Sequence, residues 1–109
     1  MGVDLKLLVV AKEESARWHV AQAIELARNY SLHDEVRGTL AKDVPEGIEV
    51  ETGYGWRATD GYGPLQFTTV KKLAKLKLYS VLYLGGHPVP VDVDLGEFSP
   101  DTKVVLFWH

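Results

Sequence analysis

The chain has 109 residues and a formal net charge of −3 at neutral pH. This length favours one domain with a single core, and the mild charge gives no support for polyanion binding or for a nucleic-acid mimic. Cysteine is absent, which excludes disulfides, thiolate catalysis and cysteine-ligated metal sites. A hydrophobic content of 46% argues against global disorder.

The N-terminal residues show no targeting or membrane signal. Residues 1–4 lack the basic region that precedes a signal-peptide core, and no apolar run approaches the length of a membrane span. We therefore expect a soluble, cytoplasmic protein with no membrane partner.

The first part of the chain predicts a strand followed by a helix. Residues 5–11 form a short apolar run rich in β-forming residues, typical of a strand buried on both faces. Residues 16–30 place apolar side chains at helical spacing after an acidic start. Trp18 would then point away from the apolar stripe, either covered or tolerated at the surface, or as a contact point for another chain.

The middle of the chain carries weaker signals and one clear alternation. Residues 33–42 fit either a short strand or a short helix, and residues 42–47 read as a turn. Alternating apolar and polar residues over 48–59 predict a long strand. Asp60-Gly61 is a favoured hairpin turn, and Pro64 should soon weaken the strand that returns from it.

The last part predicts a short helix and three strands. Either Thr68 or Thr69 could cap a helix over 70–77. Strands are expected over 78–84, over 89–95 as a half-buried edge strand, and over 103–109 as a packed final strand, with a turn at 85–88. The resulting order predicts an α+β domain over 1–109. It would have two helices on a mostly antiparallel sheet, in the ferredoxin-like βαββαβ arrangement with two added C-terminal strands.

Residues 52–64 are the strongest candidate for a binding surface, because they combine four glycines with aromatic residues and contain Gly-Tyr-Gly twice. Tyr54 and Trp56 lie in phase with the apolar face of the expected strand, so a core role and a ligand role both stay open. In a ligand role, Trp56 and Tyr62 would offer stacking faces, Arg57 an anion contact and Asp60 a hydrogen-bond acceptor.

Catalytic and metal-binding patterns are weak. The four histidines include no spaced ligand pair, and the serines show no nucleophile motif. Gly53-Tyr54-Gly55 matches neither a Rossmann fingerprint nor a P-loop. His87 lies in a glycine turn near Asp92 and Asp94, where it could act as base or ligand or serve turn geometry alone. We expect no metal and no cofactor.

These patterns predict a non-catalytic binding module that holds a protein partner or a small anionic ligand through residues 52–64 and Trp18, with a homodimer through sheet edges as a further expectation. The composition is similar to that of small accessory proteins such as phage-encoded inhibitors. The alternative is a small enzyme with Arg57, Asp60 and His87 in one cleft. A weaker alternative is RNA binding by Lys71, Lys72, Lys75 and Lys77, although nucleic acid is not expected from the net charge.

Overall fold

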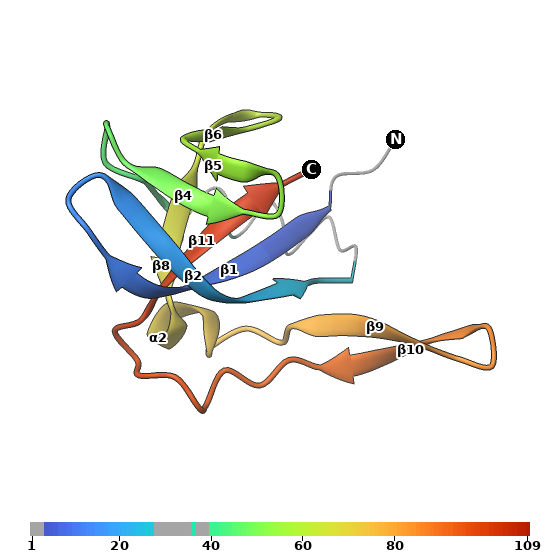
Figure 1. Ribbon diagram of the computed structural model, residues 1–109. Coiled ribbons are helices and arrows are strands. Elements are labelled where there is room, and N and C mark those ends of the chain that lie inside the picture. The colour runs from blue at the N-terminus through green and yellow to red at the C-terminus, as the bar shows by residue number, and fades with distance from the viewer. Residues whose placement is uncertain (1–3, 28–35, 37–39) are drawn as a thin grey trace.

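The computed structural model describes residues 4–27, 36 and 40–109, and it is built mainly of β-strands. Strands account for 56% of the described residues, and this part of the chain has one short helix, α2 (Val70–Leu73). The predicted α+β, ferredoxin-like arrangement with two helices on a sheet is therefore wrong. The molecule consists of a curled sheet and a separate two-stranded ribbon (Figure 1).

Seven strands form the larger sheet, in the order β3-β8-β11-β1-β2-β4-β5. All neighbouring strands pair antiparallel except β2 and β4, which pair in parallel. The seven strands are β1 (Leu5–Glu13), β2 (Arg17–Glu25), β3 (Lys42–Asp43), β4 (Glu49–Thr52), β5 (Gly55–Arg57), β8 (Gln66–Thr69) and β11 (Lys103–Trp108). Between β5 and β8, β6 (Thr59–Asp60) and β7 (Gly63–Pro64) form a small hairpin of their own.

The central strands β1 and β11 are buried on both faces, as their continuous apolar sequences predict. Alternate residues of each strand enter two different hydrophobic clusters, one on each face of the sheet. The first cluster includes Leu5, Leu7, Val9, Val104, Leu106 and Trp108. The second includes Leu8, Val10, Val105 and Phe107.

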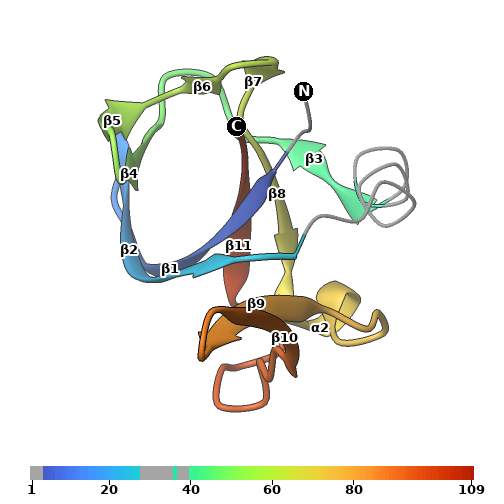
Figure 2. The same cartoon turned by 90° about the vertical axis from the view of Figure 1, so that its right-hand side faces the viewer.

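The sheet curls, so that its strands form a ring in the view of Figure 2. Residues of β1, β2, β4 and β11 contribute to the second cluster, which we place on the concave face of the sheet. The opposite face packs on the first cluster, to which α2 and the loop before β11 contribute Val70, Leu73 and Leu95. The predicted cap is confirmed, because Thr69 precedes α2 and its hydroxyl accepts from the Lys72 N–H at 3.4 Å. The helix ends at Leu73, well short of the expected residue 77.

The helix expected over 16–30 is wrong, because residues 17–25 form β2. The chain turns back after β1, with the Glu14 N–H bonded to the Arg17 carbonyl, and β2 then pairs along β1. An apolar central strand needs hydrogen-bond partners on both sides, and this requirement overrides the modest helical propensity of an alanine-rich segment. Trp18 consequently belongs to the second cluster and is only 2% exposed.

The long strand expected over 48–59 is also wrong, because the chain folds back at Gly53–Tyr54 between β4 and β5. Gly55 has a φ of 98°, which a side chain would disfavour. The Thr52 hydroxyl holds the turn, accepting from the Tyr54 N–H at 3.1 Å and donating to the Gly55 carbonyl at 2.7 Å. The next hairpin exists as predicted, but its turn lies at Gly61–Tyr62, one residue later.

The ribbon consists of β9 (Tyr79–Leu84) and β10 (His87–Asp92), joined by a turn at Gly85–Gly86. We refer to this ribbon as the arm, because it projects from the curled sheet (Figure 1). Both strands were expected, but β10 was expected to be half-buried, and of its residues only Val89 is partly covered.

Two further expectations concern residues 33–42 and membrane-spanning segments. Most of residues 33–42, left open between strand and helix, lies outside the described residues. In the part of the chain that the structure describes, no helix is long and apolar enough to cross a membrane.

Candidate functional site

The arm exposes large hydrophobic side chains on both of its faces. Tyr83 is 69% exposed and Leu84 56% exposed, values far above those of the two clusters in the curled sheet. One face carries Ser80, Leu82, Leu84, His87, Val89 and Val91, and the other carries Tyr79, Val81, Tyr83, Pro88, Pro90 and Asp92. Soluble monomers rarely expose large contiguous apolar patches, and such patches commonly mark interaction surfaces.

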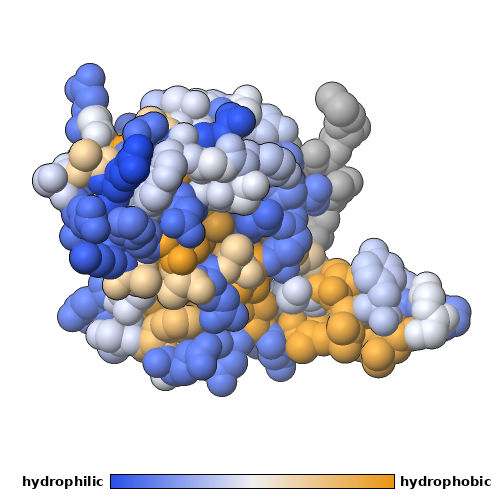
Figure 3. All heavy atoms as spheres, viewed as in Figure 1, coloured by the Kyte–Doolittle hydropathy of each residue, from blue (hydrophilic) through white to orange (hydrophobic). Residues whose placement is uncertain are grey.

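Charge is missing from the same segment. Residues 78–91 contain no Asp, Glu, Lys or Arg, although these residues make up 25% of the chain. Figure 3 shows apolar residues gathered where the arm leaves the curled sheet, while most of the remaining surface in that view is hydrophilic. An exposed ribbon would normally carry charges that keep it soluble and unpaired, so this composition calls for a partner.

Two hydrogen bonds fix which backbone groups of the arm point outward. The Val93 N–H donates to the Leu78 carbonyl at 2.9 Å, so the backbone polar groups of Leu78 point toward the β10 side of the arm. The Ala27 N–H donates to the Tyr79 carbonyl at 2.6 Å, so the backbone polar groups of Tyr79 point away from β10. Because this direction alternates along an antiparallel strand, Val81 and Tyr83 also present their N–H and C=O groups outward. Within the described residues, these two have no backbone partner on that side.

The other edge of the arm differs. By the same alternation, the outward-facing residues of β10 are Pro88, Pro90 and Asp92. Proline has no N–H, so two of these three positions cannot donate to an added strand. The arm therefore has one edge that can accept a further strand and one edge that resists it.

A groove of about 410 Å³ runs beside the open edge of β9. Ser80, Val81 and Tyr83 line it from the arm, and the end of β2 lines it with Leu26 and Ala27. Asp4 and Glu25 complete the lining with two acids. The space beside β9 is thus partly enclosed and has a mixed apolar and polar lining.

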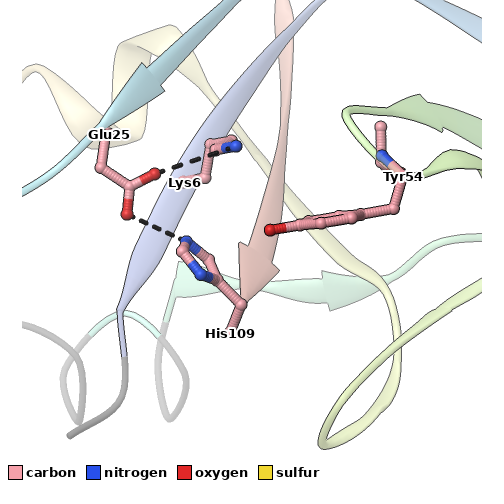
Figure 4. A network of polar contacts seen from close by, with 5 residues as sticks. Lys6, Glu25, Tyr54 and His109 are labelled. Atoms are coloured by element: carbon pink, nitrogen blue, oxygen red, sulfur yellow. Dashed lines mark hydrogen bonds and ion pairs between the residues drawn. The ribbon is translucent and has the colours of Figure 1, made fainter.

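A second surface surrounds Tyr54 at the rim of the curled sheet. The Tyr54 ring is 59% exposed and stacks on Phe107 with 5.7 Å between ring centroids. The Lys6 ammonium lies 5.8 Å from the Tyr54 ring centroid and the Arg57 guanidinium carbon 6.0 Å from it, both within cation–π range. Figure 4 shows Tyr54 beside the ion pairs of Glu25 with Lys6 and with His109.

The same rim holds the one group of metal-type ligands found in the described residues, formed by Asp4, Glu25 and His109. One ligand atom from each lies within 4.8 Å of the others. Glu25 already has two partners, however, with His109 Nε2 at 2.9 Å and Lys6 Nζ at 4.0 Å. A cation bound there would have to compete with both, so the cluster is better explained as an ion-pair network.

Trp56 lies apart from Tyr54, among charged residues of β2. The Arg17 guanidinium carbon is 4.6 Å from its ring centroid, and the His19 ring meets it edge-on at 5.2 Å. His19 in turn contacts Glu14, whose pKa is lowered chiefly by the Lys12 hydrogen bond and further by the charge of His19. Trp56 is half-buried by these neighbours, which fits a packing role at the sheet edge.

The predicted site residues therefore occupy five separate places. Trp18 is in the core, and Tyr54 and Trp56 belong to different surroundings at the β4–β5 hairpin. Asp60 accepts from the backbone N–H groups of Tyr62 and Trp108, at 2.7 Å and 3.3 Å, so it supports a turn and the end of β11. His87 lies on the arm, and no described pocket is lined by more than one of Arg57, Asp60 and His87.

Sequence reasoning missed the arm as an interaction surface. Its strands were expected to lie in the sheet, where their apolar residues would be covered. The absence of charged residues over 78–91 is visible in the sequence, but it fits a buried strand as well as an exposed ribbon. Only the strand topology decides between the two.

The comparisons with known proteins add no assignment to this geometry. No protein-family model, curated protein or solved structure matches the chain. The expected similarity to small accessory proteins gains no support from them, and any function must be argued from the surfaces themselves.

Proposed function

We propose that this protein is a non-catalytic binding module that contacts a protein partner through the arm. The observation that carries the proposal is the largely exposed ribbon over residues 79–91, which contains no Asp, Glu, Lys or Arg. A two-stranded ribbon is only marginally stable in water by itself, and a partner that covers its apolar faces would stabilise it. This proposal keeps the binding role expected from the sequence and moves the contact from residues 52–64 to the arm.

Photo-cross-linking tests this proposal. We would replace Leu84 with p-benzoylphenylalanine and use Tyr62 as the matched control, since both side chains are at least half exposed and both adjoin a hairpin turn. The expected result is a protein adduct at Leu84 that reforms with the purified components, and none at Tyr62. Adducts at Tyr62 alone, or none at either position, would overturn the proposal.

The rim around Tyr54 supports a second candidate, the binding of a small anionic ligand. Its support is the exposed ring with Lys6 and Arg57 on it, an arrangement that offers a stacking face and two cations. Inorganic phosphate and a nucleoside monophosphate are suitable probes, followed by NMR of the backbone amides. Shifts confined to residues around Tyr54 support this candidate, and their absence at saturating probe removes it.

A further inference from the structure

We propose that the partner of the arm is a second copy of this chain, which adds its own β9 to the open edge of β9. The inference rests on the proposed function and specifies its partner. The two β9 strands would run antiparallel about a two-fold axis, with Val81 of one copy opposite Tyr83 of the other. The result is a four-stranded sheet in the strand order β10-β9-β9-β10.

The backbone of β9 is suited to this pairing. Val81 and Tyr83 present N–H and C=O groups outward with no partner among the described residues. Strand addition satisfies such groups and is a common mode of recognition at sheet edges. The groove of about 410 Å³ beside these residues provides room for the incoming strand.

The prolines of β10 argue for a closed dimer. If both edges of the arm were open, strand addition could continue from copy to copy and produce fibres. Pro88 and Pro90 remove two of the three outward donors from β10 and leave only that of Asp92, which disfavours addition of a further strand after two copies. The outer edges of the four-stranded sheet would then both be proline-bearing β10 strands.

Among the surfaces of the molecule, the arm is one where charge does not oppose a second copy. Each molecule carries a net charge of −3, so two copies repel each other over most contact surfaces. Residues 78–91 carry no Asp, Glu, Lys or Arg, and pairing through them brings no like-charged side chains of the two β9 strands together. A third and fourth strand also remove the marginal stability of a lone two-stranded ribbon.

The test combines sedimentation velocity with residue-level amide exchange on the full chain. We expect a reversible dimer, with the Val81 and Tyr83 amides gaining protection as the concentration rises. The Asp92 amide, which faces outward on β10, should stay unprotected. The Leu82 amide, bonded within the arm, should be protected at every concentration and reports that the arm itself is folded.

Two proline variants separate the edges. Val81→Pro removes an outward donor on β9, and Asp92→Pro removes the matched donor on β10. Val81→Pro should weaken dimerisation by about a hundredfold, because the two-fold axis makes the substitution act twice, whereas Asp92→Pro should leave it unchanged. Tyr83→Pro serves as a second β9 variant if Val81→Pro loses the protection of Leu82.

Several outcomes would overturn the inference. These are a monomer at the highest attainable concentration, a dimer in which the Val81 and Tyr83 amides exchange freely, or equal effects of the two proline variants. Binding of the monomer to phosphatidylcholine vesicles through the arm would also overturn it. If the chain is monomeric but Leu84 cross-links to a different protein, the proposed function stands and this inference fails; if Leu84 cross-links to nothing, both fail.

Discussion

Trp18 is a large buried residue of the second cluster in the curled sheet. Its ring meets Phe67 edge-on at 5.4 Å, and the Lys103 ammonium lies 4.9 Å from its centroid. Lys103 also pairs with Glu13, so the charged group covers the indole while it is held by an acid. Trp18 therefore packs in the second cluster on one side and contacts a charged surface residue on the other.

Replacing this side chain should be costly. Trp18→Ala is expected to lower the free energy of unfolding by about 3–5 kcal/mol, the range for large aromatic residues in well-packed cores. Urea denaturation followed by circular dichroism measures the loss. Tyr62→Ala is the matched control, because that ring is 50% exposed, and its effect should stay within about 0.5 kcal/mol. A similar loss for both variants would show that Trp18 is not packed as described.

At the scale of single elements, the turn of the arm depends on two glycines in the left-handed region. Gly85 has a φ of 58° and Gly86 a φ of 82°, as a two-residue turn with both φ values positive requires. Such a turn matches the right-handed twist of the strands and fixes the pairing register of Leu84 with His87. The alternation of inward and outward groups along β9 follows from that register.

Gly86→Ala should destabilise the arm by about 1 kcal/mol, because alanine disfavours a positive φ. The amides of Leu82 and Leu84 would then exchange faster. Gly85→Asn should be tolerated, since Asn-Gly is a preferred pair in this turn. Gly61→Ala is a further control, because Gly61 does not have a positive φ and the space around it is open. Slower exchange in Gly86→Ala would contradict the assigned turn.

At the scale of the whole molecule, the arm and the curled sheet have different sources of stability. The curled sheet has two hydrophobic clusters. The arm pairs within itself and is anchored at its base, where Leu78 and Val93 pack on the first cluster and Tyr79 bonds to the end of β2. The sheet should therefore fold without the distal part of the arm.

A shortened protein tests this independence. Replacing residues 81–90 with Asn-Gly closes the inward-facing pair of Ser80 and Val91 with a two-residue turn, which keeps the base of the arm and removes most of the exposed ribbon. The midpoint of thermal unfolding should change by only a few degrees, because few contacts of the clusters are lost. Thermal scans by circular dichroism measure this change, and loss of cooperative unfolding would show that the sheet needs the arm.

The sequence alone determined the elements whose signals are local. The apolar run at 5–11 predicted a strand buried on both faces, and the run at 103–109 predicted a packed final strand. Thr68 or Thr69 predicted the start of a short helix, and the glycines at 85 and 86 predicted a turn. These predictions are confirmed because burial, capping and turn geometry depend on residues close together in the chain.

Only the tertiary structure decided the fates of residues 17–25, 48–59 and 78–91. The first segment is a strand because β1 needs a hydrogen-bonded neighbour, although its own spacing is helical. The second breaks at Gly53–Tyr54, because a turn and an alternating strand share the same sequence there. Most of the third segment is exposed because its two strands pair only with each other in the described structure. An apolar sequence alone does not determine which surface covers it.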